Sequence, residues 1–267
     1  MDDTLKGQVT RSAAEIYEEF FLPALFQEWA TRVADAAQLA PGQQVLDVAC
    51  GTGVLAREAA KRVAPGGTVS GLDRNDGMLA VARRKAPDLT WKLGMAEALP
   101  FADRSFDRVV SQFGLMFFDD RVKALREMGR VLKRRGRLVV AVWNALETTP
   151  GYAAMVALLD RLFGQRVAAG LRAPFVLGDA TVLRALFEEA GIADVEIRTQ
   201  VGTARFPSIE SWVHTDIRGW TPADLIDDRQ YELLQREAAV ALRRFVRADG
   251  TVAFDAPAHI VTAQRVD

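Results

Sequence analysis

The sequence predicts an α/β protein built around a doubly wound, mostly parallel, seven-stranded sheet. Three observations support this prediction. Between residues 43 and 143, short apolar segments alternate with helical segments of ten or more residues, the pattern of βαβ units. The first apolar segment runs into a glycine-rich turn, Gly51-Thr52-Gly53, directly before a helix. Two apolar segments near the C-terminus, residues 194–205 and 251–266, can pair at the edge of the sheet.

The N-terminal part of the chain is expected to be a helical cover. Residues 11–39 have helical periodicity, because aromatic and aliphatic residues recur every four positions, at Tyr17, Phe21, Leu25, Trp29 and Val33. Pro23 starts a second helix or kinks the first. The pair Pro41-Gly42 ends this region, so we expect a cover over residues 1–40 and a main domain over residues 41–267.

Turn and cap residues divide the main domain into strands and helices. The expected strands are residues 43–50, 68–73, 89–94, 106–112, 137–143, 194–205 and 251–266. The expected helices between them are residues 53–63, 76–85, 120–132 and 179–191, the last with Asp179 as its cap. Residues 145–178 and 208–247 interrupt the alternation and indicate helical insertions. In the second insertion, Thr221-Pro222 is expected to start a helix that ends near Gly250.

Composition indicates a globular protein whose partner is a small molecule. The 267 residues are 49% hydrophobic, and 34 Lys and Arg against 35 Asp and Glu give a formal net charge of −1, so a nucleic-acid partner is not expected. One cysteine and two histidines favour neither a disulfide framework nor a four-ligand zinc site. No secretory signal and no apolar stretch of ~18 residues is found, so we expect a cytoplasmic protein without a membrane span. The sequence does not indicate an oligomeric state.

Two acidic residues suggest what the glycine-rich turn binds. Asp47 lies four residues before Gly51, where a carboxylate would repel a pyrophosphate but could accept hydrogen bonds from a ligand ammonium. Asp73 follows Gly53 by 20 residues, at the end of the next strand, where an acidic side chain can accept from both hydroxyls of a ribose. A ligand with a ribose and an amino-acid cation therefore fits better than the dinucleotide that the G-x-G-x-x-A pattern of residues 51–56 would suggest.

These motifs resemble those of class I S-adenosylmethionine-dependent methyltransferases, particularly the branch with the ubiquinone and menaquinone biosynthesis C-methyltransferases and many small-molecule methyltransferases. The resemblance spans about residues 39–144, and the matching segments are residues 47–53, 71–73 with Met78, 96–101 and 106–112. It implies a Rossmann-like methyltransferase fold in which the helical insertions cap the acceptor site. It also implies S-adenosylmethionine as cofactor and S-adenosylhomocysteine as product.

The resemblance assigns cofactor contacts by position. The implied cofactor-binding residues are Tyr17, Asp47, Ala49, Gly51, Thr52, Gly53, Asp73, Arg74, Met78, Ala96, Glu97, Ser111, Gln112 and Phe113. The two glycines would wrap the methionine portion, and Asp73 would hold the ribose. Tyr17 belongs to the expected N-terminal cover. If it does not contact the cofactor, it is expected to be a core residue. Many relatives have Gly-Asp-Ala where this chain has Gly94-Met95-Ala96, so the adenine amine must be recognised by a carbonyl, a water or Glu97.

The implied reaction is methyl transfer to a small aromatic or otherwise apolar acceptor. After residue 110 the chain reads Ser111-Gln112-Phe113-Gly114, not the Asn/Asp-Pro-Pro-aromatic motif of enzymes that methylate amino groups of DNA bases or protein amides. The candidates for the acceptor pocket are Phe117, Trp143, Trp212 and Trp220. His214 is the candidate general base, or otherwise a structural residue. Asp119-Asp120 could hold a metal, but a doublet before a helix is more typical of a cap, so no metal is assigned.

Two alternatives remain open at the level of sequence. A nucleotide-dependent oxidoreductase would explain the G-x-G-x-x-A pattern, and it predicts binding of NAD. A non-catalytic, S-adenosylmethionine-binding regulatory protein would explain the missing adenine-binding Asp and the lack of an evident base, and it predicts binding without turnover.

Overall fold

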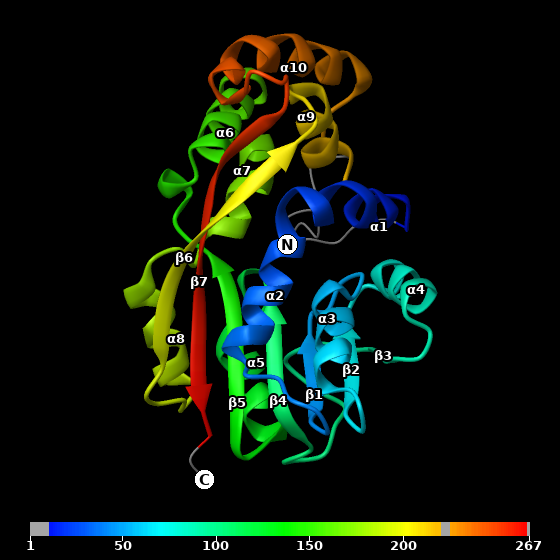
Figure 1. The fold of residues 1–267 in the computed structure, drawn as a ribbon. Helices are drawn as coiled ribbons and strands as arrows, with labels where there is room; N and C mark the ends of the chain where they lie inside the picture. The colour runs from blue at the N-terminus through cyan, green and yellow to red at the C-terminus, as the bar shows by residue number, and fades with distance from the viewer. Residues whose placement is uncertain (1–10, 220–224, 266–267) are drawn as a thin grey trace.

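A seven-stranded sheet with the order β3-β2-β1-β4-β5-β7-β6 forms the centre of the molecule (Figure 1). The computed structural model describes residues 11–219 and 225–265. The strands are β1 (Gln44–Val48), β2 (Thr68–Asp73), β3 (Thr90–Leu93), β4 (Phe106–Gln112), β5 (Leu132–Trp143), β6 (Glu196–Phe206) and β7 (Val252–Gln264). Strands β1 to β5 pair in parallel, and β7 runs antiparallel to both β5 and β6. The predicted sheet is therefore confirmed.

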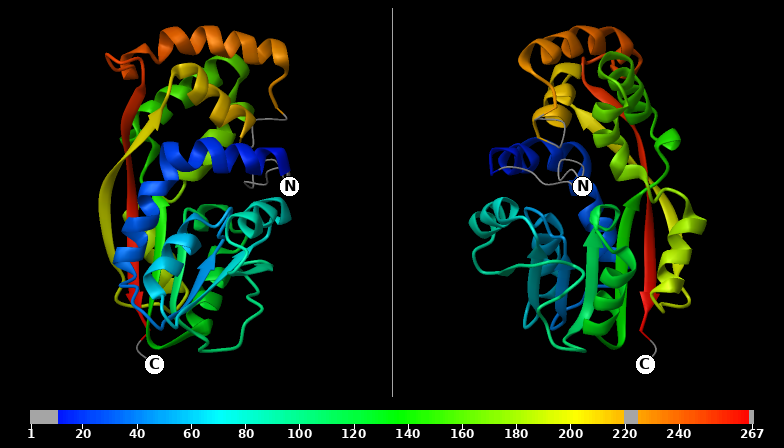
Figure 2. Two further views of the ribbon diagram at one scale, coloured as in Figure 1. Left: turned by 45° about the vertical axis from the view of Figure 1, so that its right-hand side comes forward. Right: turned by 180° about the vertical axis from the view of Figure 1, so that it is seen from behind.

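Helices cover both faces of the parallel part of this sheet, as its buried strands require. The helices are α2 (Gln27–Ala36), α3 (Val54–Val63), α4 (Asp76–Lys85), α5 (Arg121–Val131) and α8 (Ala180–Glu189). The views from front and back show α2 and α3 on one face and α5 and α8 on the other (Figures 1 and 2). Val45, Leu46 and Val48 of β1 consequently have no exposed surface.

Side-chain caps set the boundaries of three helices, and two of these caps, Asp120 and Asp179, were predicted. The side chains of Asn75, Asp120 and Asp179 each accept a hydrogen bond from a backbone N–H in the first turn of α4, α5 and α8. Gly191, with φ of +80°, follows the end of α8. The expected starts of these three helices are thereby confirmed to within a residue.

The N-terminal helical segment crosses the carboxyl ends of the parallel strands. It consists of α1 (Arg11–Ile16), the π-helical segment η2 (Tyr17–Phe26) and then α2, and it changes direction between η2 and α2 (Figure 1). Pro23 starts no new helix; it lies inside η2. Proline has no N–H for the i→i−4 hydrogen bond of an α-helix and its ring clashes with that carbonyl, which accounts for the wider turn.

A helical cap lies beyond the same ends of the strands (Figure 2). It is formed by α6 (Pro150–Phe163), α7 (Gln165–Arg172), α9 (Ile209–Arg218) and α10 (Asp228–Ala241). Gly164, with φ of +79°, divides the insertion at residues 145–178 into two helices. Helix α9 lies within the expected helical insertion at residues 208–247, but its separate start after the Ser208 cap was not predicted. The expected start at Thr221-Pro222 lies outside the described residues. Within the described ranges, no helix is long and apolar enough to cross a membrane.

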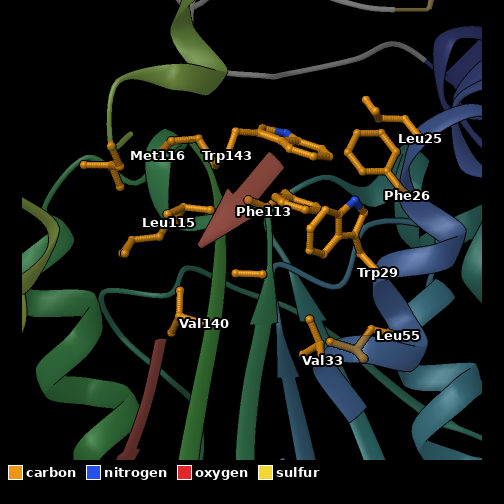
Figure 3. Close-up of a cluster of buried hydrophobic side chains, with 14 of the residues drawn as sticks. Leu25, Phe26, Trp29, Val33, Leu55, Phe113, Leu115, Met116, Val140 and Trp143 are labelled. Carbon is orange, nitrogen blue, oxygen red and sulfur yellow. The ribbon is translucent and has the colours of Figure 1, made fainter. Parts of the chain in front are cut away.

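Short 3₁₀ segments complete the connections: η3 (Leu115–Phe117), η4 (Leu146–Thr148), η5 (Ala173–Phe175) and η7 (Arg243–Phe245). An aromatic cluster then joins the N-terminal helices to the ends of β4 and β5 (Figure 3). The rings of Phe113 and Trp143 stack with centroids 3.8 Å apart, and Trp29 packs edge-on against both. Since each such pair contributes about 0.5–1.5 kcal/mol beyond its buried area, the cluster fixes the N-terminal segment over the sheet.

Candidate active site

Two adjoining cavities lie where the carboxyl ends of the strands meet the N-terminal helices and the cap. The first cavity is lined by residues that follow β1, β2, β3 and β4, together with Tyr17. The second cavity is lined by η2, the end of β5 and residues of α6, α7, η5 and α9. Tyr17, Phe113 and Phe117 line both cavities, so these rings form a wall that the two cavities share.

The first cavity brings most of the predicted cofactor-binding residues together. Those that line it are Tyr17, Ala49, Gly51, Asp73, Arg74, Met78, Ala96, Glu97, Gln112 and Phe113. The parallel register explains this, because it places the end of β1 beside the ends of β2 and β4. Asp47, Thr52, Gly53 and Ser111 do not line the cavity. Three of these four, Asp47, Thr52 and Ser111, are 1% exposed or less and lie behind its wall.

The backbone at the rim of the first cavity has unusual dihedral angles. Gly51 has φ of +54°, and the non-glycine residues Ala49 and Phe113 have φ of +59° and +58°. A side chain in this region is crowded against its own backbone, so such residues persist where the surrounding structure holds them and often mark functional sites. Here both strained residues line the cavity at the ends of neighbouring strands, β1 and β4.

Asp73 ties the turn after β1 to the end of β2. Its two carboxyl oxygens accept hydrogen bonds from the backbone N–H of Gly51 and of Asn75, both at 2.8 Å. Burial raises the pKa of Asp73, and the hydrogen bonds from Asn75 and Gly51 lower it in part. A carboxylate has about four acceptor positions, so these two bonds leave others for hydroxyls of a ligand.

Several buried polar atoms around the first cavity have no hydrogen-bond partner within the described part of the chain. They are both carboxyl oxygens of Asp47, Oγ1 of Thr52, Oγ of Ser111 and Oε1 of Gln112. Burial is also the main cause that raises the pKa of Asp47. An unsatisfied buried polar group costs about 1–3 kcal/mol, so this concentration of acceptors and hydroxyls suits a polar ligand with hydrogen-bond donors.

Polar contacts hold the N-terminal segment above the first cavity. Gln112 donates from Nε2 to the carbonyl of Phe26 at 3.0 Å. Arg57 of α3 contacts Glu18 of η2 at 3.0 Å and donates to the carbonyl of Thr52 at 2.6 Å. Arg57 and Glu18 were missed by sequence reasoning, because neither lies in a motif and their contact spans 39 positions.

Gly53 has a packing requirement of its own at the start of α3. It has φ of +88°, does not line the cavity, and a Cβ at this position would run into the indole ring of Trp91. The same ring lies against Gly71 of β2. Gly53 is therefore needed for the packing of Trp91 at the start of α3, whereas Gly51, whose Cβ would meet nothing within 4 Å, faces open space.

The residues near the predicted adenine edge are partly engaged by the protein itself. Oε1 of Glu97 accepts from the backbone N–H groups of Asp119 and Asp120 at 2.9 and 3.4 Å. Met95 is 42% exposed and does not line the cavity. Asp120 caps α5, as expected, and Asp119 lies 3.5 Å from Arg74. Glu97 thus remains the one carboxylate on this side of the first cavity within the described residues.

The second cavity is mostly aromatic. Phe117 and Trp143 line it, as the sequence suggested. Trp212 does not: it is fully buried behind Tyr152, with Phe254 and Phe206 at 4.7 and 5.5 Å between ring centroids. Trp220 lies outside the described residues. Tyr152, an aromatic residue of the first insertion, and Asp216, which sequence reasoning missed, contribute the polar groups on the side of the cap.

His214 lines neither cavity. Its ring packs edge-on against Phe20 with centroids 5.8 Å apart, and its Nδ1 lies 3.4 Å from the hydroxyl of Tyr231. His214 and Asp216 are two residues apart on α9. Residues at this spacing do not share a helix face, so the two side chains point in different directions. The candidate general base of the sequence analysis therefore lies outside both cavities.

We expect His214→Ala to leave cofactor affinity and turnover of the folded protein within about threefold of wild type. A general base usually contributes about 10²–10⁴-fold to the rate, so steady-state kinetics distinguishes the two roles clearly. A loss of a hundredfold or more in turnover, with cofactor affinity unchanged, would restore His214 as the base.

Comparison with known proteins identifies the relatives of this chain. Residues 46–140 match the family model described as a methyltransferase domain. The demethylmenaquinone methyltransferase of Renibacterium salmoninarum is 48% identical over 118 residues, which cover 44% of this chain and 48% of that enzyme, about half its length. The demethylmenaquinone methyltransferase of Staphylococcus aureus is 36% identical over 188 residues, covering 65% of this chain and 78% of that enzyme.

Solved structures share the fold. Phosphoethanolamine N-methyltransferase 2 of Haemonchus contortus, in complex with S-adenosyl-L-methionine, superimposes with a TM-score of 0.62 over 97% of this chain and 58% of that one. The two are 19% identical, so this likeness concerns the fold alone.

Proposed function

Because this chain belongs to the class I S-adenosylmethionine-dependent methyltransferase family that includes the demethylmenaquinone methyltransferases, we propose that it transfers a methyl group to a small aromatic or otherwise apolar acceptor. In this proposal S-adenosylmethionine occupies the first cavity and S-adenosylhomocysteine is released. The observation that carries the proposal is the pair of adjoining cavities, one that contains the carboxyl group of Asp73 and an aromatic one beneath the cap.

The residues of the first cavity fit the cofactor. Asp73 has acceptor positions left for the ribose hydroxyls, and the open space at Gly51 can take the methionine portion. Oε1 of Gln112, which lines the cavity and has no hydrogen-bond partner among the described residues, supplies an acceptor for the cofactor's ammonium group, and Asp47, behind the cavity wall, would act on that group through water. Arg74 and Met78 line the side expected for adenine.

When bound, the cofactor supplies an electrophilic methyl group on a sulfonium sulfur. The protein must then align the acceptor with that methyl group and exclude water. Phe113, Phe117 and Tyr17 are suited to this, because they line both cavities and form the boundary at which the two ligands would meet. We also propose that residues 1–40 act as a cover and that the insertions at residues 145–178 and 208–247 shape the acceptor site.

The alternatives have less support. A nucleotide-dependent oxidoreductase would have to bind a pyrophosphate at the turn after β1, close to the buried carboxyl groups of Asp47 and Asp73. The family match gives this alternative no support. A non-catalytic regulator would have no use for the aromatic second cavity next to the first.

The proposal is tested by transfer of a labelled methyl group from S-adenosylmethionine to a panel of small acceptors. The panel contains reduced demethylmenaquinone, after the substrate in the names of the relatives, together with 1-naphthol, 1-naphthylamine and naphthalene. We expect transfer to at least one ring compound, with equimolar S-adenosylhomocysteine formed. Cofactor binding without transfer to any panel member would instead favour the regulatory alternative.

A further inference from the structure

Asp216 is the one carboxyl group that lines the second cavity within residues 11–219 and 225–265. It lies on α9, is fully buried, and shares this wall with Tyr152 of α6. The remaining lining is aliphatic or aromatic, with Tyr17 as the other titratable side chain. A buried acid in an apolar cavity beside a cofactor site is a candidate for recognition or proton transfer.

One oxygen of Asp216 lacks an ordinary hydrogen bond. The hydroxyl of Tyr152 donates to Oδ1 at 3.2 Å, whereas Oδ2 is buried with no hydrogen bond of ordinary length among the described residues. The indole N–H of Trp212, one turn earlier on α9, is the other donor that acts on this carboxyl group. Burial raises the pKa of Asp216 to about 8, and the side chains of Trp212 and Tyr152 lower it only in part. Burial, with the charge of Asp216, also raises the pKa of Tyr152, so its hydroxyl stays a donor.

Charged and titratable side chains on the elements around Asp216 interact with partners other than Asp216. Arg218, on the same helix, pairs with Asp228 of α10 at 2.7 Å, and His214 faces Tyr231 of α10. From η2, Glu18 pairs with Arg57 at 3.0 Å, and from α1, Glu15 pairs with Arg84 at 3.0 Å. The end of β6 presents the ring of Phe206 to Trp212 of α9.

A structural role for this carboxyl group would be to accept from Tyr152 of α6 and Trp212 of α9. A hydrogen bond between α6 and α9 needs one acceptor, and an amide or hydroxyl would provide it without an ionisable group. Leaving a buried acceptor unpaired costs about 1–3 kcal/mol, and more when it is charged. A ligand group that pairs with Oδ2 would remove this cost.

We propose that Asp216, oriented by Tyr152, is the proton acceptor for the hydroxyl group of a hydroxylated aromatic acceptor bound in the second cavity. This inference rests on the proposed methyltransferase function. As the methyl carbon bonds to the acceptor oxygen, the electron pair of the carbon–sulfur bond stays on sulfur and the hydroxyl proton passes to Oδ2. If a conjugated ring carbon is methylated instead, that carbon later loses its own proton to water and Asp216 returns the first proton to the oxygen.

A hydroxyl fits this site better than an amine. A carboxyl group with a pKa of about 8 is mostly neutral at pH 7, so it offers little charge to an ammonium group. The same pKa brings the conjugate base closer to a phenol, whose pKa is about 10, than an ordinary carboxylate would be. Tyr152 is a positioning residue in this arrangement, because its hydroxyl contacts Oδ1 and not the reacting oxygen.

Binding of three matched ring compounds tests the recognition step. With the protein saturated with S-adenosylhomocysteine and at a pH above 8, where Asp216 is mostly ionised, calorimetry compares 1-naphthol, 1-methoxynaphthalene and 1-naphthylamine. We expect 1-naphthol to bind at least tenfold more tightly than the other two, and Asp216→Leu to remove this preference while S-adenosylhomocysteine affinity stays unchanged. Equal affinity for 1-naphthol and 1-methoxynaphthalene in wild type would overturn the proposal, and tightest binding of 1-naphthylamine would assign the site to amines instead.

Turnover against pH tests the proton transfer, with the panel member that reacts fastest as substrate. Because the carboxyl group must be deprotonated to accept a proton, wild-type kcat is expected to rise with pH and to level off above about pH 8. Asp216→Asn should lower kcat by about 10²–10⁴-fold and remove this rise. Tyr152→Phe should move the midpoint to higher pH, since the hydrogen bond that lowers the pKa is lost.

The matched control is Asp228→Asn, the same chemical change at a side chain that is 94% exposed and outside both cavities. It should retain wild-type kcat and pH dependence. Wild-type kcat and an unchanged pH rise in folded Asp216→Asn would refute the inference, and the proposed function would still stand. Absence of S-adenosylhomocysteine binding in wild type would refute the proposed function itself.

Discussion

Gly51→Val is expected to abolish S-adenosylmethionine binding while the protein stays folded. A Cβ at Gly51 would meet no protein atom within 4 Å, so the valine methyl groups would project into the space that we assign to the methionine portion. The φ of +54° disfavours valine, but a left-handed residue costs about 1–2 kcal/mol against a typical stability of about 5–15 kcal/mol. The loss should therefore appear in binding.

Gly53→Ala is the control for this variant. Its Cβ would run into Trp91, and Gly53 does not line the first cavity, so we expect a lower melting temperature but near-normal cofactor affinity for the folded protein. Calorimetry and thermal melting of both variants separate the two effects. If Gly51→Val still binds S-adenosylmethionine like wild type, the methionine portion does not lie at this turn.

Asp73→Ala is expected to weaken S-adenosylmethionine and S-adenosylhomocysteine in parallel, by roughly 10- to 1,000-fold. Hydrogen bonds to a charged group contribute about 1.5–3 kcal/mol each, and both ligands carry the same ribose. The structure adds a second cause, because Asp73 also accepts from the backbone of Gly51 and Asn75 and so holds the turn beside the ligand.

Titration calorimetry of both ligands measures this loss, with Asp47→Ala for comparison. Asp47 does not line the cavity, so its removal should weaken both ligands by less than the removal of Asp73. Affinities of Asp73→Ala within about threefold of wild type, a change below ~1 kcal/mol, would show that the ribose is not held at the end of β2.

Most of the fold could be predicted because its signals are local. The apolar strands, the caps at Asn75, Asp120 and Asp179, and the turn at residues 51–53 all depend on residues close in sequence. The π-helical segment around Pro23 and the separate start of α9 within the second insertion were not predicted. The first depends on how η2 packs over the strands, and the second has only a Ser208 cap as its signal.

The two cavities differ in how far sequence could predict them. The first is built from the ends of adjacent parallel strands, so motifs after β1, β2 and β4 had to meet there. The second depends on how the insertions pack. Asp216 and Tyr152 are 64 positions apart and lie in no motif, whereas Trp212, which looked like a pocket residue, faces Phe254 in the core.

The central claim is that the first cavity binds S-adenosylmethionine rather than a nicotinamide dinucleotide. Calorimetric titration of the purified wild-type chain with S-adenosylmethionine, S-adenosylhomocysteine and NAD tests it most directly. We expect saturable binding of the first two at one site per chain, in competition with each other, and no heat of binding for NAD. Saturable binding of NAD, without binding of either S-adenosyl compound, would contradict the assignment.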